Sequence, residues 1–419
     1  MLQMFTFKRQ LIIEFRCSII RLNHKSLLYN INMNRFRFLT SGESHGKCLN
    51  AIIEGIPAGI RIKTSVINED LARRQVGYGR GGRMKIEKDT VEIKSGVRFG
   101  KSTGAPICLE IKNKDFENWQ EVMNTEHQDY PAQETLKKIE EKSFTTVRPG
   151  HADYAGSIKY NFTDLRNVLE RSSARKTAIE VAVGSVAKQI LKEFGIMGFS
   201  HVVQIGNVKL DFYPKTYTLI KEKAEKSDVR CADDLTADRM RNAIDEAAQA
   251  GDTLGGKFEV IFGNLPVGLG SYVHWDRCLD GRLAQAVMSI PAVKAVEIGA
   301  GVDAASLKGS QMHDEIFVKN KNVYRHTNNA GGLEGGMTNG EALVIKGTMK
   351  AIPTMRKPLA TVDIEDMQPA SAHFERSDTC AVPACAVVAE ARIAIILADE
   401  LLTKIGGDNF VEMKAHYGE

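Results

Sequence analysis

A long apolar run, a surplus of one charge and a cysteine framework are all missing from this chain of 419 residues. No stretch approaches the roughly 18 uninterrupted apolar residues that a membrane-spanning helix needs. Lys and Arg number 56 and Asp and Glu 52, so the net charge is only +4. Such a balance does not suggest a nucleic-acid coat protein or a membrane-surface protein. We therefore expect no nucleic-acid partner and no membrane partner, and any anion binding must come from local clusters of cations.

The seven cysteines are odd in number and widely spaced, which is typical of a reducing compartment and hence of the cytoplasm. The closest pair, Cys380 and Cys385, has the wrong spacing for a common zinc knuckle and no further Cys or His beside it. We predict that both are small buried apolar side chains and that the protein binds no metal.

Residues 1–32 differ from the rest of the chain. They carry five cations and a single acid, Glu14, which fits a basic, acid-poor transit peptide. The same composition fits translation from a start codon upstream of Met33, and we favour this explanation because the segment is not rich in Ser. We predict an N-terminal extension over residues 1–32, disordered or not native, with organellar import as the alternative. No Pro- or Ser-rich linker interrupts residues 33–419, which predicts a single compact domain.

Apolar residues recur with helical spacing in three segments, 177–194, 236–247 and 387–401. Thr177 and Glu180 form a candidate capping box, Thr236 a candidate N-cap, and Gly406 a stop for the third segment. Short apolar runs predict strands at 51–53, 91–93, 107–111, 258–262 and 342–345. Strands and helices do not alternate regularly, so we predict a mixed α+β fold with sheets and segregated helices. The charged stretch 221–234 is predicted to be a solvated excursion.

Two segments echo one another. Residues 54–60 read Glu-Gly-Ile-Pro-Ala-Gly-Ile, and residues 263–269 read Gly-Asn-Leu-Pro-Val-Gly-Leu, each directly after an apolar strand. An internal duplication with a pseudo-twofold axis predicts such an echo, and chance similarity between two Pro-Gly turns explains it equally well.

Residues 73–85 are the strongest local anomaly, with five cations among four glycines and no acid until Glu87. Glycine lets the backbone approach a ligand, and arginine offers a flat, bidentate fork to a carboxylate or phosphate. An RNA-binding segment, a mobile lid over a small polyanion and a plain solvated loop all fit this composition. Arg/Gly tails that bind RNA are usually longer and terminal, so we favour the lid.

Further polar residues stand beside glycine or serine. His45 follows Glu43 closely, and His151 lies on an Arg-Pro-Gly-His turn. Segment 171–175 precedes a predicted helix, where hydroxyls, free amides and arginines can bind a phosphate. Singly, these residues and Asp378 fit structural histidines, ordinary caps or a local ion pair. Together they predict an enzyme site that gathers arginines around a polyanion, with two histidines and an aspartate for proton transfer near neutral pH.

At these segments the sequence resembles the chorismate synthase family, over essentially all of residues 33–419. The matching segments are Gly-Glu-Ser-His-Gly at 42–46, Arg-Gln-Val-Gly-Tyr-Gly-Arg-Gly-Gly-Arg at 74–83, Arg-Pro-Gly-His-Ala-Asp at 148–153, Leu-Glu-Arg-Ser-Ser-Ala-Arg at 169–175 and Glu-Arg-Ser-Asp-Thr-Cys at 375–380, with further similarity at 309–314 and 328–340. One match would be weak, but this many in the order of the family is highly specific.

The resemblance implies a carbon–oxygen lyase. The reaction is the 1,4-elimination of phosphate and a ring proton from 5-enolpyruvylshikimate 3-phosphate, which gives chorismate in the shikimate pathway of aromatic amino acid biosynthesis. It also implies reduced FMN as cofactor, without net redox change, and NADPH as a candidate reductant of the flavin. Because no large insertion is evident, we expect the flavin to be reduced from outside the protein. A flavin-dependent oxidoreductase on the same scaffold is the alternative.

The resemblance further implies a β-α-β sandwich of antiparallel sheets around helices, a homotetramer and a set of residue roles. His45 would protonate the departing phosphate, His151 would maintain the protonation state of the flavin, and Asp378 would act with the flavin N5 in removing the ring proton. The arginines expected around the substrate are Arg74, Arg80, Arg83, Arg148, Arg175 and Arg376, the first two also near a nicotinamide nucleotide. The residues expected to contact the flavin are Arg171, Ser172, Ser173, Pro291, Ala292, Gly335, Lys350, Ala351, Ile352, Pro353, Thr354 and Arg376.

Overall fold

The computed structural model describes residues 35–81, 88–127, 132–375 and 377–418. The predicted extension over residues 1–32 and the predicted site residues Arg83 and Arg376 lie outside these ranges. The chain divides into two units, Met1–Arg35 and Phe36–Glu419, and the second contains all the described helices and strands. Across the described ranges, every helix is too short or too polar to cross a membrane.

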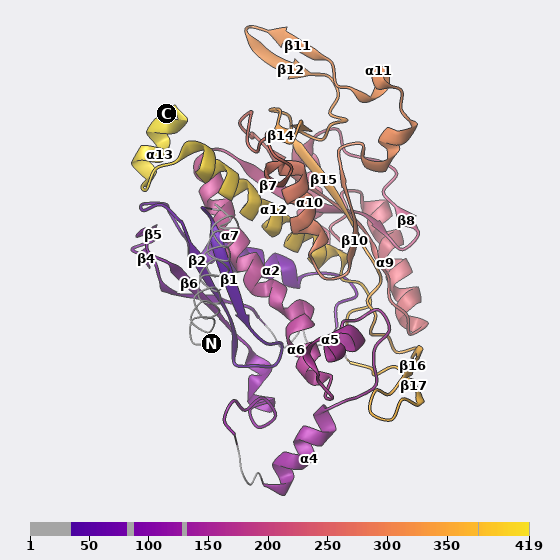
Figure 1. The fold of residues 1–419 in the computed structure, drawn as a ribbon. Coiled ribbons are helices and arrows are strands. Elements are labelled where there is room, and N and C mark those ends of the chain that lie inside the picture. Colours follow the sequence, from indigo (N-terminus) through magenta and orange to yellow (C-terminus); the bar gives the residue numbers. More distant parts are fainter. Residues whose placement is uncertain (1–34, 82–87, 128–131, 376, 419) are drawn as a thin grey trace, which may run out of the picture. The chain divides into compact units, whose positions relative to one another are not determined.

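Two antiparallel sheets enclose a layer of helices (Figure 1). The first sheet has the strand order β1 (Arg37–Gly42), β2 (Cys48–Glu54), β6 (Ile107–Lys112) and β3 (Val91–Ser95). The second has the order β10 (Val293–Ile298), β15 (Leu343–Met349), β9 (Gly256–Gly263), β7 (Met197–Ile205) and β8 (Val208–Lys209). The helices of the middle layer are α2 (Thr64–Gln75), α7 (Thr177–Glu193), α10 (Leu279–Met288) and α12 (Val382–Ile405). This arrangement is the predicted β-α-β sandwich.

The two long helices hold the layers together. Helix α7 contacts β2 and β6 of the first sheet, α12 contacts β7 and β9 of the second, and the two helices pack against each other. Because α12 lies between α7 and a sheet, it is buried on almost every side rather than along one stripe. A Cβ added at Gly184 of α7 would lie 2.4 Å from the Cβ of Ala391, so the glycine permits this close approach.

The other described elements are shorter. The helical segments are η1 (Lys114–Asn118), α4 (Gln133–Lys142), α5 (Asp153–Tyr160), α6 (Arg166–Ser172), η2 (Ala174–Lys176), α8 (Tyr217–Lys226), α9 (Asp234–Gln249), η3 (Trp275–Arg277), η4 (Gly301–Ser306), α11 (Gly309–Met312) and α13 (Phe410–Tyr417). The strand pairs are β4 (Val97–Arg98) with β5 (Lys101–Ser102), β11 (Ile316–Lys319) with β12 (Asn322–Arg325), β13 (Leu333–Glu334) with β14 (Met337–Thr338), and β16 (Ala360–Val362) with β17 (Pro369–Ser371).

All three predicted helices and all five predicted strands are present, as α7, α9, α12, β2, β3, β6, β9 and β15. The helix starts were predicted less well. Thr177 donates to the carbonyl of Ala174, and Glu180 pairs with Arg392 of α12 at 2.9 Å, so the predicted capping box is wrong. The N-cap of α9 is Asp233, whose side chain accepts from the amide of Thr236. At α7 the two residues of the expected capping box bond to Ala174 and to Arg392 instead of to each other's amides. At α9 the cap comes from Asp233, three residues before the expected Thr236.

The prediction of a solvated excursion at residues 221–234 is only partly right, because Lys221, Glu222, Lys223, Lys226 and Asp234 are exposed but other residues of the segment are buried. Ala224 is fully buried, and Arg230 is only 5% exposed. Glu225 of α8 pairs with Arg230 and with Arg73 of α2, and Arg73 also pairs with the buried Glu390 of α12. Glu225 and Arg230 therefore belong to an ionic network with the buried Glu390, and Arg73 is part of that network rather than of the Arg/Gly loop.

Two further predictions concern the core. Cys380 and Cys385 are buried and carry free thiols, as predicted. The echoing segments 54–60 and 263–269 follow inner strands of different sheets and each ends on a fully buried residue. The internal duplication itself stays a prediction.

Candidate active site

A buried pair of arginines lies just before the start of α7. Arg175 of η2 donates to Asp89 at 2.8 Å and, through two nitrogens, to Asn113 Oδ1 at 2.9 and 3.0 Å. Arg74, from the last turn of α2, donates to Thr177 Oγ1 at 3.0 Å. Helices α2 and α7 thus bring together two arginines that are a hundred residues apart in the chain.

The charge on Arg74 is only partly balanced. Its Nη1 is buried, makes no hydrogen bond within the described residues and lies 3.7 Å from Asp89. Burial, aided by the charges of Arg80 and Arg175 and opposed by those of Asp89 and Asp378, lowers the pKa of Arg74 to about 9. An additional anion next to this guanidinium would favour its charged form.

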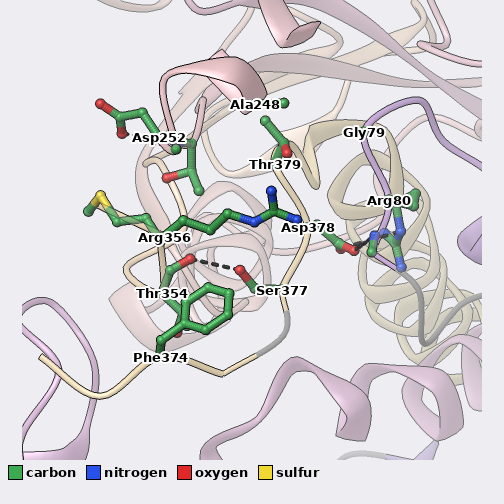
Figure 2. Close-up of a pocket in the computed structure, with 14 residues that line it drawn as sticks. Gly79, Arg80, Ala248, Asp252, Thr354, Arg356, Phe374, Ser377, Asp378 and Thr379 are labelled. Carbon is green, nitrogen blue, oxygen red and sulfur yellow. Dashed lines mark hydrogen bonds and ion pairs between the residues drawn. The ribbon is translucent and has the colours of Figure 1, made fainter. Parts of the chain in front are cut away.

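Arg80 and Asp378 line a cavity of about 480 Å³ (Figure 2). Asp378 accepts a hydrogen bond from the Gly81 amide at 2.7 Å, and its other oxygen lies 3.3 Å from Arg80 Nε. The lining residues are Gly79, Arg80, Gly81, Ala248, Gly251, Asp252, Thr253, Thr354, Met355, Arg356, Phe374, Ser377, Asp378 and Thr379. The glycines of the Arg/Gly segment let its backbone approach the Asp378 segment, because a Cβ at Gly81 would lie 2.9 Å from the Ser377 carbonyl oxygen.

Arg356 is a cavity residue that sequence reasoning missed. Figure 2 shows its side chain extending from the Thr354 segment into the cavity, on the side opposite Arg80. Its position two residues beyond the predicted flavin segment 350–354 was the available signal. With Arg80 it gives the cavity two guanidinium groups, which suits an anionic ligand.

The second predicted histidine forms a tight triad. His151 Nδ1 lies 2.5 Å from Asp153, and Arg148 donates to both oxygens of the same carboxylate at 2.7 and 2.8 Å. Burial alone would raise the pKa of Asp153, but the hydrogen bonds from His151 and Arg148 outweigh it and hold that pKa well below its usual value. The carboxylate therefore stays charged and orients both partners.

Segment 350–354 lies against this triad. Lys350 Nζ donates to the Gly150 carbonyl oxygen at 2.5 Å, and burial together with Lys294 lowers the pKa of Lys350. The Lys350 amide donates to the carbonyl of Ala292, which adopts a φ of +70°, a conformation rare outside glycine. Ser377 Oγ donates to the Thr354 carbonyl oxygen at 2.7 Å, which connects the segment to the cavity.

His45 is held by α6. Glu170 accepts hydrogen bonds from both the backbone amide and Nδ1 of His45, each at 2.7 Å. The imidazole also packs against Trp119, with 4.0 Å between ring centroids and the ring planes tilted by 32°. Arg166 lies over that indole and over the ring of Phe144, and its guanidinium pairs with Glu375 at 2.7 Å.

The phenyl ring of Phe144 connects the two histidine sites, since the guanidinium of Arg148 lies 5.3 Å from the ring centroid on which Arg166 also rests. Sequence reasoning found both histidines but missed Glu170, Trp119 and Phe144. Glu170 stood inside a matched motif, whereas nothing in the sequence marked the two aromatic residues.

Of segment 171–175, Ser173 lies against the residue before His45, whereas the Arg171 side chain reaches the end of β1. Ser173 Oγ lies 3.2 Å from Ser44 Oγ, and Ser172 hydrogen-bonds only within its own helix turn, at 3.5 Å, among the bonds of the described residues. Arg171 is exposed and donates to Thr40 and to the Gly42 carbonyl at the end of β1. Its guanidinium thus supports the turn that leads to His45.

The structure does not bring Gly335 to the rest of the predicted flavin set. Gly335 is exposed in the β13–β14 turn, and its neighbour Gly332 packs on Leu343 at one end of β15. Lys350 follows Met349 at the other end of that strand. A strand of seven residues spans about 20 Å, so within one chain Gly335 is remote from the Lys350 segment.

The positions of the described cations of the Arg/Gly segment argue against the RNA-binding alternative. Arg73 and Arg74 are engaged inside the protein, and Arg80 faces the cavity beside Asp378. These three cations do not form an exposed basic strip that could follow a nucleic-acid backbone.

The comparisons with known proteins agree with one another. The model of the family described as chorismate synthase matches residues 36–402. The chain is 51% identical to the chorismate synthase of Carboxydothermus hydrogenoformans over 382 residues, which are 91% of this chain and 97% of that protein. It is 53% identical to the chorismate synthase of Alkaliphilus metalliredigens over 380 residues, 90% of this chain and 97% of that protein. The chain belongs to the chorismate synthase family.

A solved chorismate synthase structure gives the same answer for the fold. It is similar with a TM-score of 0.72 and 44% sequence identity, over 91% of this chain and 96% of that chain. The predicted family, the α+β fold and the class of enzyme, a carbon–oxygen lyase acting on a phosphate ester, are thereby confirmed.

Proposed function

We propose that the protein eliminates phosphate and a ring proton from 5-enolpyruvylshikimate 3-phosphate to give chorismate, using reduced FMN without net redox change. The observation that carries the proposal is the buried guanidinium of Arg74. Its Nη1 makes no hydrogen bond to any described residue, and burial together with the neighbouring arginines lowers its pKa. A substrate with two carboxylates and a phosphate supplies the missing negative charge. We propose that Arg74, Arg80, Arg83, Arg148, Arg175 and Arg376 surround it.

Three groups are suited to move protons. We propose that His45 protonates the departing phosphate, since an imidazole can give up a proton near neutral pH. Asp378, which keeps one oxygen toward Arg80 and lines the cavity, receives the ring proton. His151, fixed by Asp153, maintains the protonation state of the cofactor.

Most of the predicted flavin residues fit a flavin site. Lys350 is a partly buried cation, the backbone of Ala292 beside it has a positive φ, and Ser173 adds a hydroxyl near His45. We propose that they hold the flavin together with Arg171, Ser172, Pro291, residues 351–354 and Arg376. When bound, reduced FMN would supply an electron-rich ring that assists loss of phosphate. Gly335 fits this set only from another copy of the chain. Arg74 and Arg80 would lie near NADPH if it serves as the reductant, although we favour an external source.

We further propose that the protein is a cytoplasmic homotetramer. The cysteines of the described residues are free thiols, which supports a reducing compartment. Exposed apolar side chains on β11, β12 and η3 support association. We also propose that residues 33–419 form a single catalytic domain, supported by the family match over residues 36–402, and that residues 1–32 are an extension.

The test is anaerobic turnover of 5-enolpyruvylshikimate 3-phosphate with photoreduced FMN and no NADPH, followed by chorismate absorbance. Product formation supports the lyase and shows that no net hydride transfer is needed. If both ligands bind and no product forms, the proposed function is wrong. NADPH consumption in step with substrate turnover would then indicate the oxidoreductase alternative.

A further inference from the structure

Both proposed catalytic histidines bind a carboxylate through Nδ1, but the two carboxylates differ in origin. Asp153 follows His151 by two residues and belongs to the same turn. Glu170 lies 125 residues beyond His45 and reaches it from α6. The His45 pair therefore depends on how two distant segments of the chain fit together.

The contacts fix both the backbone and the ring of His45. Glu170 accepts from the His45 amide through one oxygen and faces Nδ1 with the other, both at 2.7 Å. The carbonyl of Glu170 also accepts from the Ser44 amide at 2.9 Å. Trp119 covers the imidazole at a centroid distance of 4.0 Å, and His45 is only 8% exposed. Such a double hydrogen bond to one carboxylate leaves the ring little freedom to flip.

The nearest described cation to the Glu170 carboxylate is Arg166, which is shared with a second carboxylate. Arg166 Nη1 approaches Glu170 Oε1 only to 3.8 Å, because the guanidinium of Arg166 is committed to Glu375 at 2.7 Å. Lys142 is on the indole of Trp119, with its Nζ 4.6 Å from that ring. The Glu170 carboxylate thus has His45 as its close partner and Arg166 as a more distant one.

We propose that Glu170 is a positioning residue for proton transfer, holding His45 in the Nδ1–H tautomer so that Nε2 is the nitrogen that carries the proton to the phosphate oxygen. A carboxylate beside Nδ1 also stabilises the positive charge of the ring while it holds its second proton. The inference rests on the proposed role of His45. After transfer, the proton resides on the released phosphate, and His45 returns to the neutral Nδ1–H form.

Glu170→Gln tests this role, because the amide keeps the shape but removes the charge. We expect kcat to fall about 100-fold with the substrate KM changed less than about threefold. We also expect the alkaline limb of the pH–kcat profile to move about one unit toward lower pH, since the protonated ring loses its stabilising charge. Glu170→Asp keeps the charge and should leave that limb in place while lowering kcat.

The matched control is Glu259→Gln, which removes another buried carboxylate from another histidine. His201 Nε2 lies 2.9 Å from Glu259 in the second sheet, and His201 is fully buried. This variant should keep the wild-type pH profile. If it shifts the profile as Glu170→Gln does, or if Glu170→Gln leaves the alkaline limb unmoved, the inference is wrong.

A measurement without turnover separates this inference from the proposed function. Nitrogen-15 NMR of His45, assigned with His45→Gln, should show the Nδ1–H tautomer in the wild type and its loss in Glu170→Gln. An unchanged tautomer in the variant overturns the inference. A changed tautomer with full turnover also overturns the inference, because proton transfer would then not depend on the tautomer. Full turnover in His45→Gln would instead overturn the proposed role of His45 as the acid.

Discussion

Asp378 divides its carboxylate between two partners at the edge of the cavity. One oxygen accepts from the Gly81 amide, and the other faces Arg80 Nε. The first contact fixes the Arg/Gly segment, and the second keeps a negative charge next to the cation that we assign to the substrate site. The Asp378 side chain therefore both holds the Arg/Gly segment in place and supplies the carboxylate that we propose receives the ring proton.

Asp378→Asn should separate these two roles. The amide oxygen can still accept from Gly81, but the group can no longer take up a proton, so we expect FMN binding within about twofold of wild type and a turnover at least about 100-fold lower. Phosphate release and flavin fluorescence titration measure the two effects. Asp252→Asn, on the same cavity but bonded to the Thr253 amide, is the control and should turn over normally. Normal turnover in Asp378→Asn would remove this residue from the mechanism.

Local sequence was a good guide to which residues carry chemistry but not to what holds them. His45, His151 and Asp378 were predicted from their motifs, and Asp153 stood two residues from His151. Asn113, which ties Arg175 to the loop of His45 through the carbonyl of Gly46, was not predicted. Its contacts join segments more than sixty residues apart in the chain, so no local sequence pattern could predict them.

At the scale of elements, the crossing of α7 and α12 sets the spacing of the site. Arg175 immediately precedes α7, Asp378 lies just before α12, and both charges act on Arg74. Moving the two helices apart would therefore move groups of the site as well as open the core.

Gly184→Ala tests the crossing. The new Cβ would lie 2.4 to 2.7 Å from the Cβ, Cα and carbonyl oxygen of Ala391. Relieving these clashes requires a shift of the α12 backbone, which costs more than a change of side-chain rotamer. We expect the free energy of unfolding to fall by about 1–3 kcal/mol, although alanine is the better helix former by about 1 kcal/mol. Urea denaturation gives the value. Gly263→Ala, where an added Cβ meets nothing within 4 Å, is the control. A variant as stable as wild type would show that the helices adjust without loss.

The ionic network between α2, α8 and α12 predicts a pH dependence. Burial would raise the pKa of Glu225, but hydrogen bonds from Arg230 and Arg73 outweigh it and lower that pKa to about 2. The unfolded chain, with an ordinary Glu pKa near 4.3, takes up its proton first on acidification. The stabilisation is thus complete above about pH 4.5 and is lost as the pH falls toward 2.

Glu225→Gln should therefore lower the free energy of unfolding by about 2 kcal/mol at pH 7, allowing for solvent screening of a partly exposed pair. The loss should shrink when urea unfolding is repeated at pH 3. Glu222→Gln, an exposed site on the same helix, should have no effect at either pH. An equal loss at pH 7 and pH 3 for Glu225→Gln would contradict the assigned ionic contribution.

For the whole molecule, the β11–β12 hairpin offers the clearest surface for association (Figure 1). Val318 pairs across the hairpin with Val323, and alternation along the strand places Ile316 on the same face. All three are 63 to 70% exposed, while Phe317 and Tyr324 contact one another. An apolar face of this kind on an extended hairpin is typical of a subunit interface.

If the proposed tetramer uses this hairpin, Ile316→Glu combined with Val318→Glu should yield a smaller assembly, because charges would be buried in the proposed interface. Light scattering after size exclusion measures the mass, and circular dichroism checks the fold. Lys319→Glu, at the exposed end of the same strand, is the control. An unchanged mass for the double variant would place the interface elsewhere.

The sequence by itself determined the family, the main strands and helices and the residue types of the site, because periodicity and motifs are local properties of the chain. Tertiary structure alone decided that Arg73 is a network residue, that Glu170 holds His45, that Arg356 enters the cavity and that Gly335 is remote from Lys350. The physical reason is that burial and pairing depend on which surfaces meet when two sheets close over α7 and α12, and that packing joins residues whose separation along the chain leaves no local signal.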